Sequence, residues 1–420
     1  MLIKNIRYIV TMDPQRRLIK DGAIFIEDNK IIDVGKNEIY KKYKTDDVID
    51  AKGMVAMPGL IKAHTHSPMT LMRGYIDDLP LIEWLQKLWT FEAKLKPEDC
   101  YYGSLLACLE MISFGITTFS DMYLYPNEIL KAVEKSGLRA MVSPLIFEKI
   151  NKDCNLRNAR KFLKKKTERV TPALGPHATY TCSKEELIGV ANLAEEKDVF
   201  IHTHVSETQN EVKQIKEKYG TNPVEFLNSV GLLTDKTILV HAIWVTDKEI
   251  KLIAKTGAKI VHCPIANMKL ASGVAPVHKM KNITVSIGSD GPSSNNNLDM
   301  FEEMKAAALI HKINNLDPTL IPSNYALEMA TINGAKTLGL NDTGSLEPGK
   351  KADLILIDFR KPHLTPLYNP VSHLVYSCNG GDVDTTICNG EILMKNRKFV
   401  LDAGKIMKKV EEIKEDLLKR

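Results

Sequence analysis

Short runs of β-branched and apolar residues occupy both ends of the chain and predict strands there. They cover residues 3–10, 22–27, 30–34, 353–357, 385–389 and 391–394. Asp28-Asn29 and Asn389-Gly390 each separate two neighbouring runs and predict hairpin turns. Near the C-terminus, an amphipathic helix places four apolar residues on one face: Ile406, Val410, Ile413 and Leu417. We therefore predict a small β-sandwich domain built from residues 1–57 and 344–420, with this helix included.

Between these ends the pattern changes, because short apolar runs now alternate with longer helical segments. This alternation is typical of βα units and a parallel sheet. The runs lie at 55–63, 116–120, 138–143, 170–175, 198–203, 237–240, 259–261 and 283–288. We interpret residues 58–343 as a (β/α)₈ barrel of the α/β class. Periodicity alone leaves a doubly wound sheet as the alternative.

Composition narrows the class of protein. Hydrophobic residues make up 44% of the 420 and charged residues 26%, which are ordinary globular values. The net charge of +5 is spread along the chain, so we expect no nucleic-acid partner. No apolar run approaches the ~20 residues of a membrane span, and the N-terminus lacks a signal-peptide pattern. The seven cysteines are scattered and contain no CxxC pair, so we predict a cytoplasmic protein without a disulfide framework.

Four polar clusters directly follow predicted barrel strands, where barrel active sites form. They are His64-Thr65-His66, His202-Thr203-His204 with Glu207 three residues on, His241, and Ser289-Asp290-Gly291. Residues two apart on a strand point the same way, so paired histidines can share a metal ion. A single His-x-His pair is more often an ordinary surface feature. Their coincidence at one end of a barrel predicts a metal site with three or four histidines and one aspartate.

The donor types of this site indicate its chemistry. Nitrogen and oxygen ligands without thiolate are typical of catalytic zinc sites, which keep a position for water. Zn²⁺ fits best, while Fe²⁺, Mn²⁺ and Ni²⁺ remain open by ligand type. A metal ion lowers the pKa of bound water to about 7, and Glu207 and His241 lie nearby in the sequence to handle protons. The residues therefore predict a hydrolase.

Several segments carry a resemblance to a known family. They are Pro58-Gly59-Leu60-Ile61-Lys62-Ala63-His64-Thr65-His66, Pro68-Met69-Thr70-Leu71-Met72-Arg73-Gly74, Gly175-Pro176-His177, His204-Val205-Ser206-Glu207-Thr208, Asn267-Met268-Lys269-Leu270-Ala271-Ser272-Gly273 and Gly288-Ser289-Asp290-Gly291. Over essentially its full length, the chain resembles amidohydrolase-superfamily enzymes with a mononuclear metal. It is most similar to the 5′-methylthioadenosine/S-adenosylhomocysteine deaminases, with 5′-deoxyadenosine also an expected substrate.

The resemblance implies a role for each matching residue. The metal ligands would be His64, His66, His204 and Asp290. Glu207 would protonate the purine ring nitrogen, His241 would orient the attacking hydroxide, and Asp290 would take its proton. Glu92 would bind the ribose hydroxyls and His177 would contact the sugar. The resemblance further implies one divalent metal per chain, a small nucleoside substrate and a homo-oligomer (dimer or tetramer).

Three other features qualify this interpretation. His202 is interpreted as a core residue, because the family spacing to Glu207 fits His204. Trp84 and Trp89 could line an aromatic pocket, although packing is their more common role. His262 ends a predicted strand and could line the pocket as well.

One position departs from the family pattern. Relatives that bind S-adenosylhomocysteine carry an arginine for the amino-acid carboxylate, where this chain has Pro144. Arg157 or Arg160 could substitute from the next helix, but the spacing is loose. We therefore expect an apolar 5′ substituent to be preferred.

Two functions other than nucleoside deamination are compatible with the fold and the metal-site residues. The first is another reaction of the superfamily, such as guanine or cytosine deamination. Glu92 favours a nucleoside, because a free base has no ribose to bind. The second is a non-catalytic amidohydrolase-like scaffold, and Glu207 argues against it, because a scaffold needs no proton shuttle.

Overall fold

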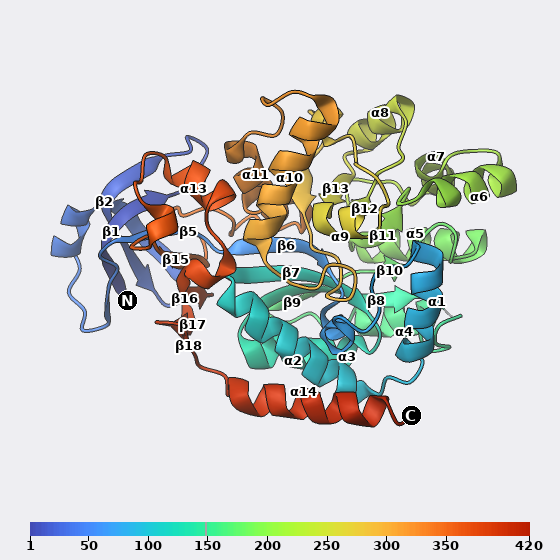
Figure 1. Cartoon of the computed structure of the whole chain (residues 1–420), viewed down its shortest axis with the longest axis horizontal. Helices are drawn as coiled ribbons and strands as arrows, with labels where there is room; N and C mark the ends of the chain where they lie inside the picture. The colour runs from blue at the N-terminus through green and yellow to red at the C-terminus, as the bar shows by residue number, and fades with distance from the viewer. Residues whose placement is uncertain (148) are drawn as a thin grey trace.

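The centre of the molecule is a parallel β-barrel surrounded by helices (Figure 1). The computed structural model of the chain describes residues 1–147 and 149–420. One part of the barrel has the order β10–β8–β7–β6 with β9 on β8, and the other has the order β11–β12–β13–β14. The strands are β6 (Leu60–Thr65), β7 (Ile116–Tyr123), β8 (Arg139–Ile146), β9 (Val170–Pro172), β10 (Gly175–Pro176), β11 (Ile201–Val205), β12 (Thr237–His241), β13 (Lys259–His262) and β14 (Val285–Ile287).

Backbone contacts join the two parts into a closed barrel. Parallel bridges connect Leu174 with Ile201 and Ala178 with His204. On the opposite side, the amide of Ser289 donates to the carbonyl of His64 at 3.1 Å. The predicted (β/α)₈ barrel is therefore confirmed, and the carboxyl ends of its strands meet at one rim.

Several helices of the barrel begin at a capping side chain. Ser183, Thr208 and Thr246 each accept a hydrogen bond from the third amide of the helix that follows. Such caps satisfy backbone donors that the first helical turn leaves free. The outer helices include α2 (Pro97–Ser113), α3 (Pro126–Ser136), α5 (Lys184–Lys197), α6 (Gln209–Tyr219), α8 (Asp247–Thr256) and α10 (Met300–Asn315).

The two ends of the chain share a second sheet, which lies at the left in Figure 1. Its order is β18–β17–β16–β15–β5–β1–β2–β3, with β4 paired to β1. The N-terminal strands are β1 (Leu2–Val10), β2 (Leu18–Glu27), β3 (Lys30–Lys36), β4 (Val48–Asp50) and β5 (Met54–Pro58). The C-terminal strands are β15 (Leu354–Asp358), β16 (Val383–Cys388), β17 (Glu391–Lys395) and β18 (Lys398–Phe399). β5 pairs with β1 on one side and with β15 on the other, so the chain ends are interlocked.

The apolar run predicted at 55–63 divides at Gly59. Its first half is β5 of the terminal sheet, whereas its second half is β6, the first barrel strand. The terminal sheet also encloses its own core, with Ile3, Ile24 and Ile26 from one end and Leu354 and Ile387 from the other. We propose domains of residues 1–57 with 344–420 and of residues 58–343 on the basis of this division.

The final helix α14 (Ala403–Leu417) packs mainly on the barrel, and Phe399 of β18 borders the same apolar cluster. It runs along the lower edge of the molecule beside α2 (Figure 1). Ile406 joins Leu105 and Leu109 of α2 in one apolar cluster. Beyond the helix, Arg420 forms an ion pair with the buried Asp99 of α2. The amphipathic face predicted from the sequence therefore covers a barrel helix.

Candidate functional site

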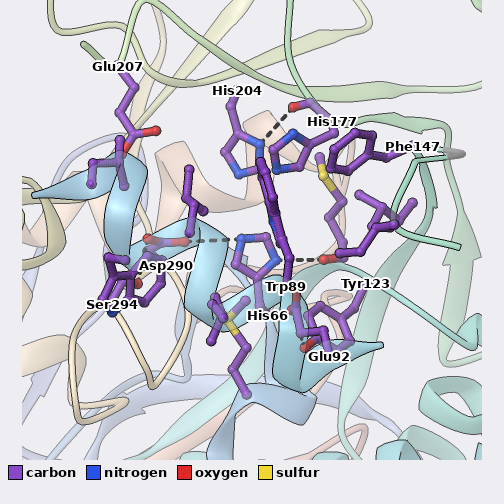
Figure 2. Close-up of a pocket in the computed structure, with 18 of the residues that line it drawn as sticks. His66, Trp89, Glu92, Tyr123, Phe147, His177, His204, Glu207, Asp290 and Ser294 are labelled. Atoms are coloured by element: carbon purple, nitrogen blue, oxygen red, sulfur yellow. Dashed lines mark hydrogen bonds and ion pairs between the residues drawn. The ribbon is translucent and has the colours of Figure 1, made fainter. Parts of the chain in front are cut away.

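A pocket opens at the rim where the carboxyl ends of the barrel strands meet (Figure 2). Nearly all of the residues proposed from the sequence line it, namely His66, Glu92, His177, His204, Glu207, His241 and Asp290. His64 is fully buried next to the pocket. The residues come from segments scattered over more than half of the chain, and the barrel brings them together.

Four side chains form a cluster that fits one metal ion. One ligand atom each of His64, His66, His204 and Asp290 lies within 4.8 Å of all the others. His64 Nε2 lies 3.2 Å from His204 Nε2 and 3.3 Å from Asp290 Oδ1, and His66 Nε2 lies 3.1 Å from the same oxygen. Tetrahedral zinc with bonds of about 2.0–2.1 Å holds its ligand atoms roughly 3.3 Å apart. The spacing of these atoms therefore fits a metal site.

Hydrogen bonds to the backbone orient two of the three histidines. His66 Nδ1–H donates to the carbonyl of Met122 at 2.6 Å, and His204 Nδ1–H donates to the carbonyl of His177 at 2.7 Å. A carbonyl can only accept, so in each neutral ring the Nε2 atom keeps its lone pair. These lone pairs are what a metal ion requires.

The backbone around Asp290 explains the Gly288-Ser289-Asp290-Gly291 motif. A Cβ atom at Gly288 would lie 2.8 Å from Cβ of His64, so only glycine fits where these strands approach. Asp290 has a φ of 57°, and His241 and Ser206 also have positive φ values of 71° and 51°. Such left-handed backbone costs of order 1–3 kcal/mol per residue and clusters at functional sites.

Glu207 and His241 lie beside the metal cluster. His241 Nδ1–H donates to Oδ1 of Asn267 at 2.9 Å, which directs Nε2 toward Glu207, 3.9 Å from its Oε2. Burial raises the pKa of Glu207 above its ordinary value, so its carboxyl holds a proton more readily than an exposed glutamate does. Asp290 is held on its other oxygen by Ser294 Oγ, which donates at 2.6 Å.

A second carboxylate occupies the opposite end of the pocket. In Figure 2, Glu92 and Tyr123 lie across from Glu207 and Asp290, with His66 and His204 between them. Tyr123 Oη donates to Glu92 at 2.5 Å, and burial raises the pKa of Glu92 to about 7. Glu92 ends the helix α1 (Leu81–Glu92), and Tyr123 ends β7. This end of the pocket can therefore bind hydroxyl groups of a ligand.

Apolar side chains form most of the remaining pocket wall. Trp84 and Trp89 of α1 both line it, together with Leu85 and Leu88. His177 stacks on Phe147 with ring centroids 5.2 Å apart, and burial lowers the pKa of His177 to about 3. A flat, neutral ring system of a ligand would fit between such walls.

A sequence match over most of the chain shows which protein family this pocket belongs to. The sequence profile of the amidohydrolase family matches residues 55–393. The chain belongs to the amidohydrolase family. The predicted resemblance is therefore confirmed, and with it the expectation that the chain is an enzyme.

Close relatives of this amidohydrolase match it over nearly its full length. A 5′-deoxyadenosine deaminase from Methanosarcina acetivorans is 47% identical, covering 100% of this chain and 99% of the relative. A 5-methylthioadenosine/S-adenosylhomocysteine deaminase from Thermococcus sibiricus is 49% identical, covering 94% of both chains. A zinc-bound adenosine deaminase structure from Xanthomonas campestris has a TM-score of 0.96 at 31% identity, covering 100% of this chain and 98% of the other.

Some candidate residues of this amidohydrolase lie away from the pocket. His262 faces His311 of α10, with Nε2 atoms 3.3 Å apart, and is not among the lining residues. Arg160 forms an exposed ion pair with Glu196. Among the described residues, no arginine lines the pocket, and Arg157 is absent from it as well. Pro144 lines a neighbouring cavity, which shares only Tyr123 and Leu145 with the pocket.

Other contacts at the site were not predicted from the sequence, although His202 was expected to be a buried core residue and is one. Tyr123, Asn267 and Ser294 contact Glu92, His241 and Asp290 respectively, and His202 contacts His64. The sequence offered a signal for two of these residues. Asn267 begins the family motif at 267–273, and Ser294 lies three residues after the family motif at 288–291. Tyr123 lies three residues beyond the predicted run 116–120, and no motif pointed to it.

Proposed function

We propose that this amidohydrolase deaminates adenosine-type nucleosides with modified 5′ positions. The observation that carries the proposal is a pair of carboxyl groups at opposite ends of one pocket, with Glu92 buried and the Glu207 side chain 12% exposed. Glu207 lies beside the metal cluster, and Glu92 lies at the far end beside Tyr123. A nucleoside has a base to be attacked at one end and ribose hydroxyls to be bound at the other. The names of the deaminase relatives support the same substrate class.

We propose zinc as the metal, held by His64, His66, His204 and Asp290. The donor set of three imidazoles and one carboxylate supports it, and the adenosine deaminase of known structure was solved with bound zinc. When bound, the ion would lower the pKa of a water molecule, so that a nucleophile able to attack carbon is available at neutral pH.

The chain's own residues would then perform the proton transfers. Glu207 donates a proton to the purine ring nitrogen next to C6, and the upward shift of its pKa by burial supports this role. His241, fixed by Asn267, orients the attacking water, and Asp290 accepts a proton from it. The amino group then takes the proton that Asp290 accepted from the water, the C6–N bond breaks, and ammonia leaves. The proton from Glu207 stays on the ring nitrogen, the remaining hydroxyl proton returns to Glu207, and the product is the inosine analogue.

Release of ammonia from a panel of substrates tests this proposal. The panel contains adenosine, 5′-deoxyadenosine, 5′-methylthioadenosine, S-adenosylhomocysteine, guanine and cytosine. We expect release from the nucleosides and none above background from the free bases. Preferential release from guanine or cytosine would contradict the proposal, and no release from any member would contradict adenosine-type deamination altogether.

Within the panel, 5′-deoxyadenosine and 5′-methylthioadenosine are expected to have higher kcat/KM than S-adenosylhomocysteine. The pocket wall includes the apolar side chains of Leu145, Phe147 and Ile150. An apolar 5′ group can be buried against them without losing a hydrogen bond to water. The carboxylate of a homocysteine tail would lose its hydration in the pocket, and no fixed cation there would compensate for that loss. A clear preference for S-adenosylhomocysteine would contradict this and would indicate that its tail reaches Lys161 or Lys165 of the neighbouring cavity.

Glu92 is expected to account for the preference for ribose. Loss of a partner hydroxyl costs about 1–3 kcal/mol, so 2′-deoxyadenosine should have roughly 10- to 100-fold lower kcat/KM than adenosine. In Glu92→Gln this penalty should shrink, because the charged acceptor is gone. In the wild type, kcat/KM for adenosine should fall as the pH drops through about 7, since protonation removes the carboxylate. Glu92→Gln should lack this acid limb, and an unchanged penalty and pH profile would contradict the role of Glu92.

Two further expectations have not been tested. In the part of the chain that the structure describes, no helix combines the length and apolar character needed to cross a membrane. A cytoplasmic location and a homo-oligomeric state, dimer or tetramer, stay predictions.

A further inference from the structure

His202 lies directly beneath the metal cluster and is completely buried. Its Nε2 atom lies 2.8 Å from Nδ1 of His64, and its Nδ1 atom lies 3.2 Å from Oγ of Ser120 and 3.5 Å from Oγ of Ser143. All four side chains have no solvent exposure. His202 therefore links β6 and β11 with β7 and β8 inside the barrel.

His64 differs from the other two histidines of the cluster in what supports it. His66 and His204 donate to backbone carbonyls, which no substitution of a side chain removes. The contact from Nδ1 of His64 goes instead to another imidazole, which can either donate or accept. The protonation pattern of His64 therefore depends on the tautomer of His202.

Only one tautomer of His202 is compatible with a metal ion on His64. Nε2 of His64 faces Asp290 and His204, so it must keep its lone pair and the proton must lie on Nδ1. That proton needs an acceptor, and Nε2 of His202 supplies one when the proton of His202 is on Nδ1. The hydroxyl oxygens of Ser120 and Ser143 face this Nδ1–H and can accept it.

We propose that His202 is a positioning residue for the metal site, which holds His64 in the tautomer and orientation that bind the ion. It is not itself a ligand. The inference rests on the metal part of the proposed function and not on the identity of the substrate. Outer partners of metal-bound histidines typically change metal affinity by 10- to 100-fold when removed.

Zinc affinity, measured by competition with a chelator, tests the proposal without reference to activity. His202→Leu removes the acceptor at similar volume and should raise the apparent Kd for zinc by about 10- to 100-fold. His202→Gln keeps a carbonyl oxygen that can accept the hydrogen bond from His64, so its zinc affinity should fall less than that of His202→Leu. The matched control is His262→Leu, which removes another buried histidine from a barrel strand end without contact to the ligands. It should bind zinc like the wild type.

Two outcomes of this competition would overturn the proposal. One is His202→Leu with wild-type zinc affinity, and the other is an equal loss in His262→Leu, which would show a general effect of removing a buried histidine. If the wild type itself binds no zinc, the proposed metal site fails instead. The two failures are thus distinguishable.

A measurement on the zinc-loaded wild type covers the case in which His202→Leu does not fold. Long-range ¹⁵N–¹H spectra of histidine-labelled protein report which ring nitrogen carries the proton. We expect His202 to be protonated on Nδ1 and unprotonated on Nε2. A proton on Nε2 of His202 would overturn the proposal, because that nitrogen could then not accept from His64.

Discussion

Glu207→Gln is expected to lower kcat for deamination by about 10²-fold or more while zinc content stays near the wild-type value. Glutamine preserves the size of the side chain and can still accept hydrogen bonds. Its amide N–H is not acidic, so it cannot deliver a proton to the ring nitrogen. Positioned acid–base groups typically contribute 10²–10⁴-fold to a rate. The measurement is the steady-state rate of ammonia release, with metal analysis on the same preparation.

A matched control is available four residues further along the chain. Glu211 is buried, and its carboxylate accepts from the amide of Glu207 at 2.8 Å and from Thr179 Oγ1 at 2.6 Å. Glu211→Gln keeps an acceptor in place, so it should reduce the rate far less than Glu207→Gln. Near wild-type turnover in Glu207→Gln would remove Glu207 from the mechanism.

Removal of the metal ion is expected to lower the rate by on the order of 10³-fold or more, because the pKa of water without a metal is about 15.7 and not about 7. Addition of one equivalent of zinc per chain should restore activity. The one-to-one ratio follows from the structure, since among residues 1–147 and 149–420 only one cluster brings three or more suitable ligands together.

Metal analysis of the isolated protein checks this ratio directly. A second ion would need an additional bridging group, such as the carboxylated lysine of binuclear relatives near the fourth strand. Here that segment reads Gly175-Pro176-His177 and offers none. Two tightly bound ions per chain, or full activity of the stripped protein, would contradict the mononuclear assignment.

The sequence predicted those parts of the fold that depend on local patterns. Runs of β-branched residues located the strands, and the alternation with helical segments indicated the barrel. The division of the run at 55–63 was not predicted, because apolar residues dominate on both sides of Gly59. What separates β5 from β6 is the choice of partner strand, and those partners lie elsewhere in the chain: β1 and β15 for β5, and β7 for β6.

The candidate site shows the same limit. The ligands could be proposed because each lies near or just after the end of a strand, within a recognisable motif: His64, His66, His204 and Asp290. The contact of His64 with His202 joins residues 138 positions apart and depends on the closure of the barrel. Tyr123 reaches Glu92 across 31 positions, from a strand to a helix end. No local pattern contains such pairs, so their roles emerge only from the folded chain.

His177 contributes to the site through two chemically independent parts. Its carbonyl oxygen accepts from the metal-cluster residue His204, whereas its ring faces the pocket and stacks on Phe147. Every amino acid has a carbonyl, so any side chain at position 177 leaves the anchor of His204 in place. Selection, natural or in the laboratory, can therefore vary this position to reach new nucleosides without first losing the metal centre. Position 202, where the side chain itself is the anchor, offers no such freedom.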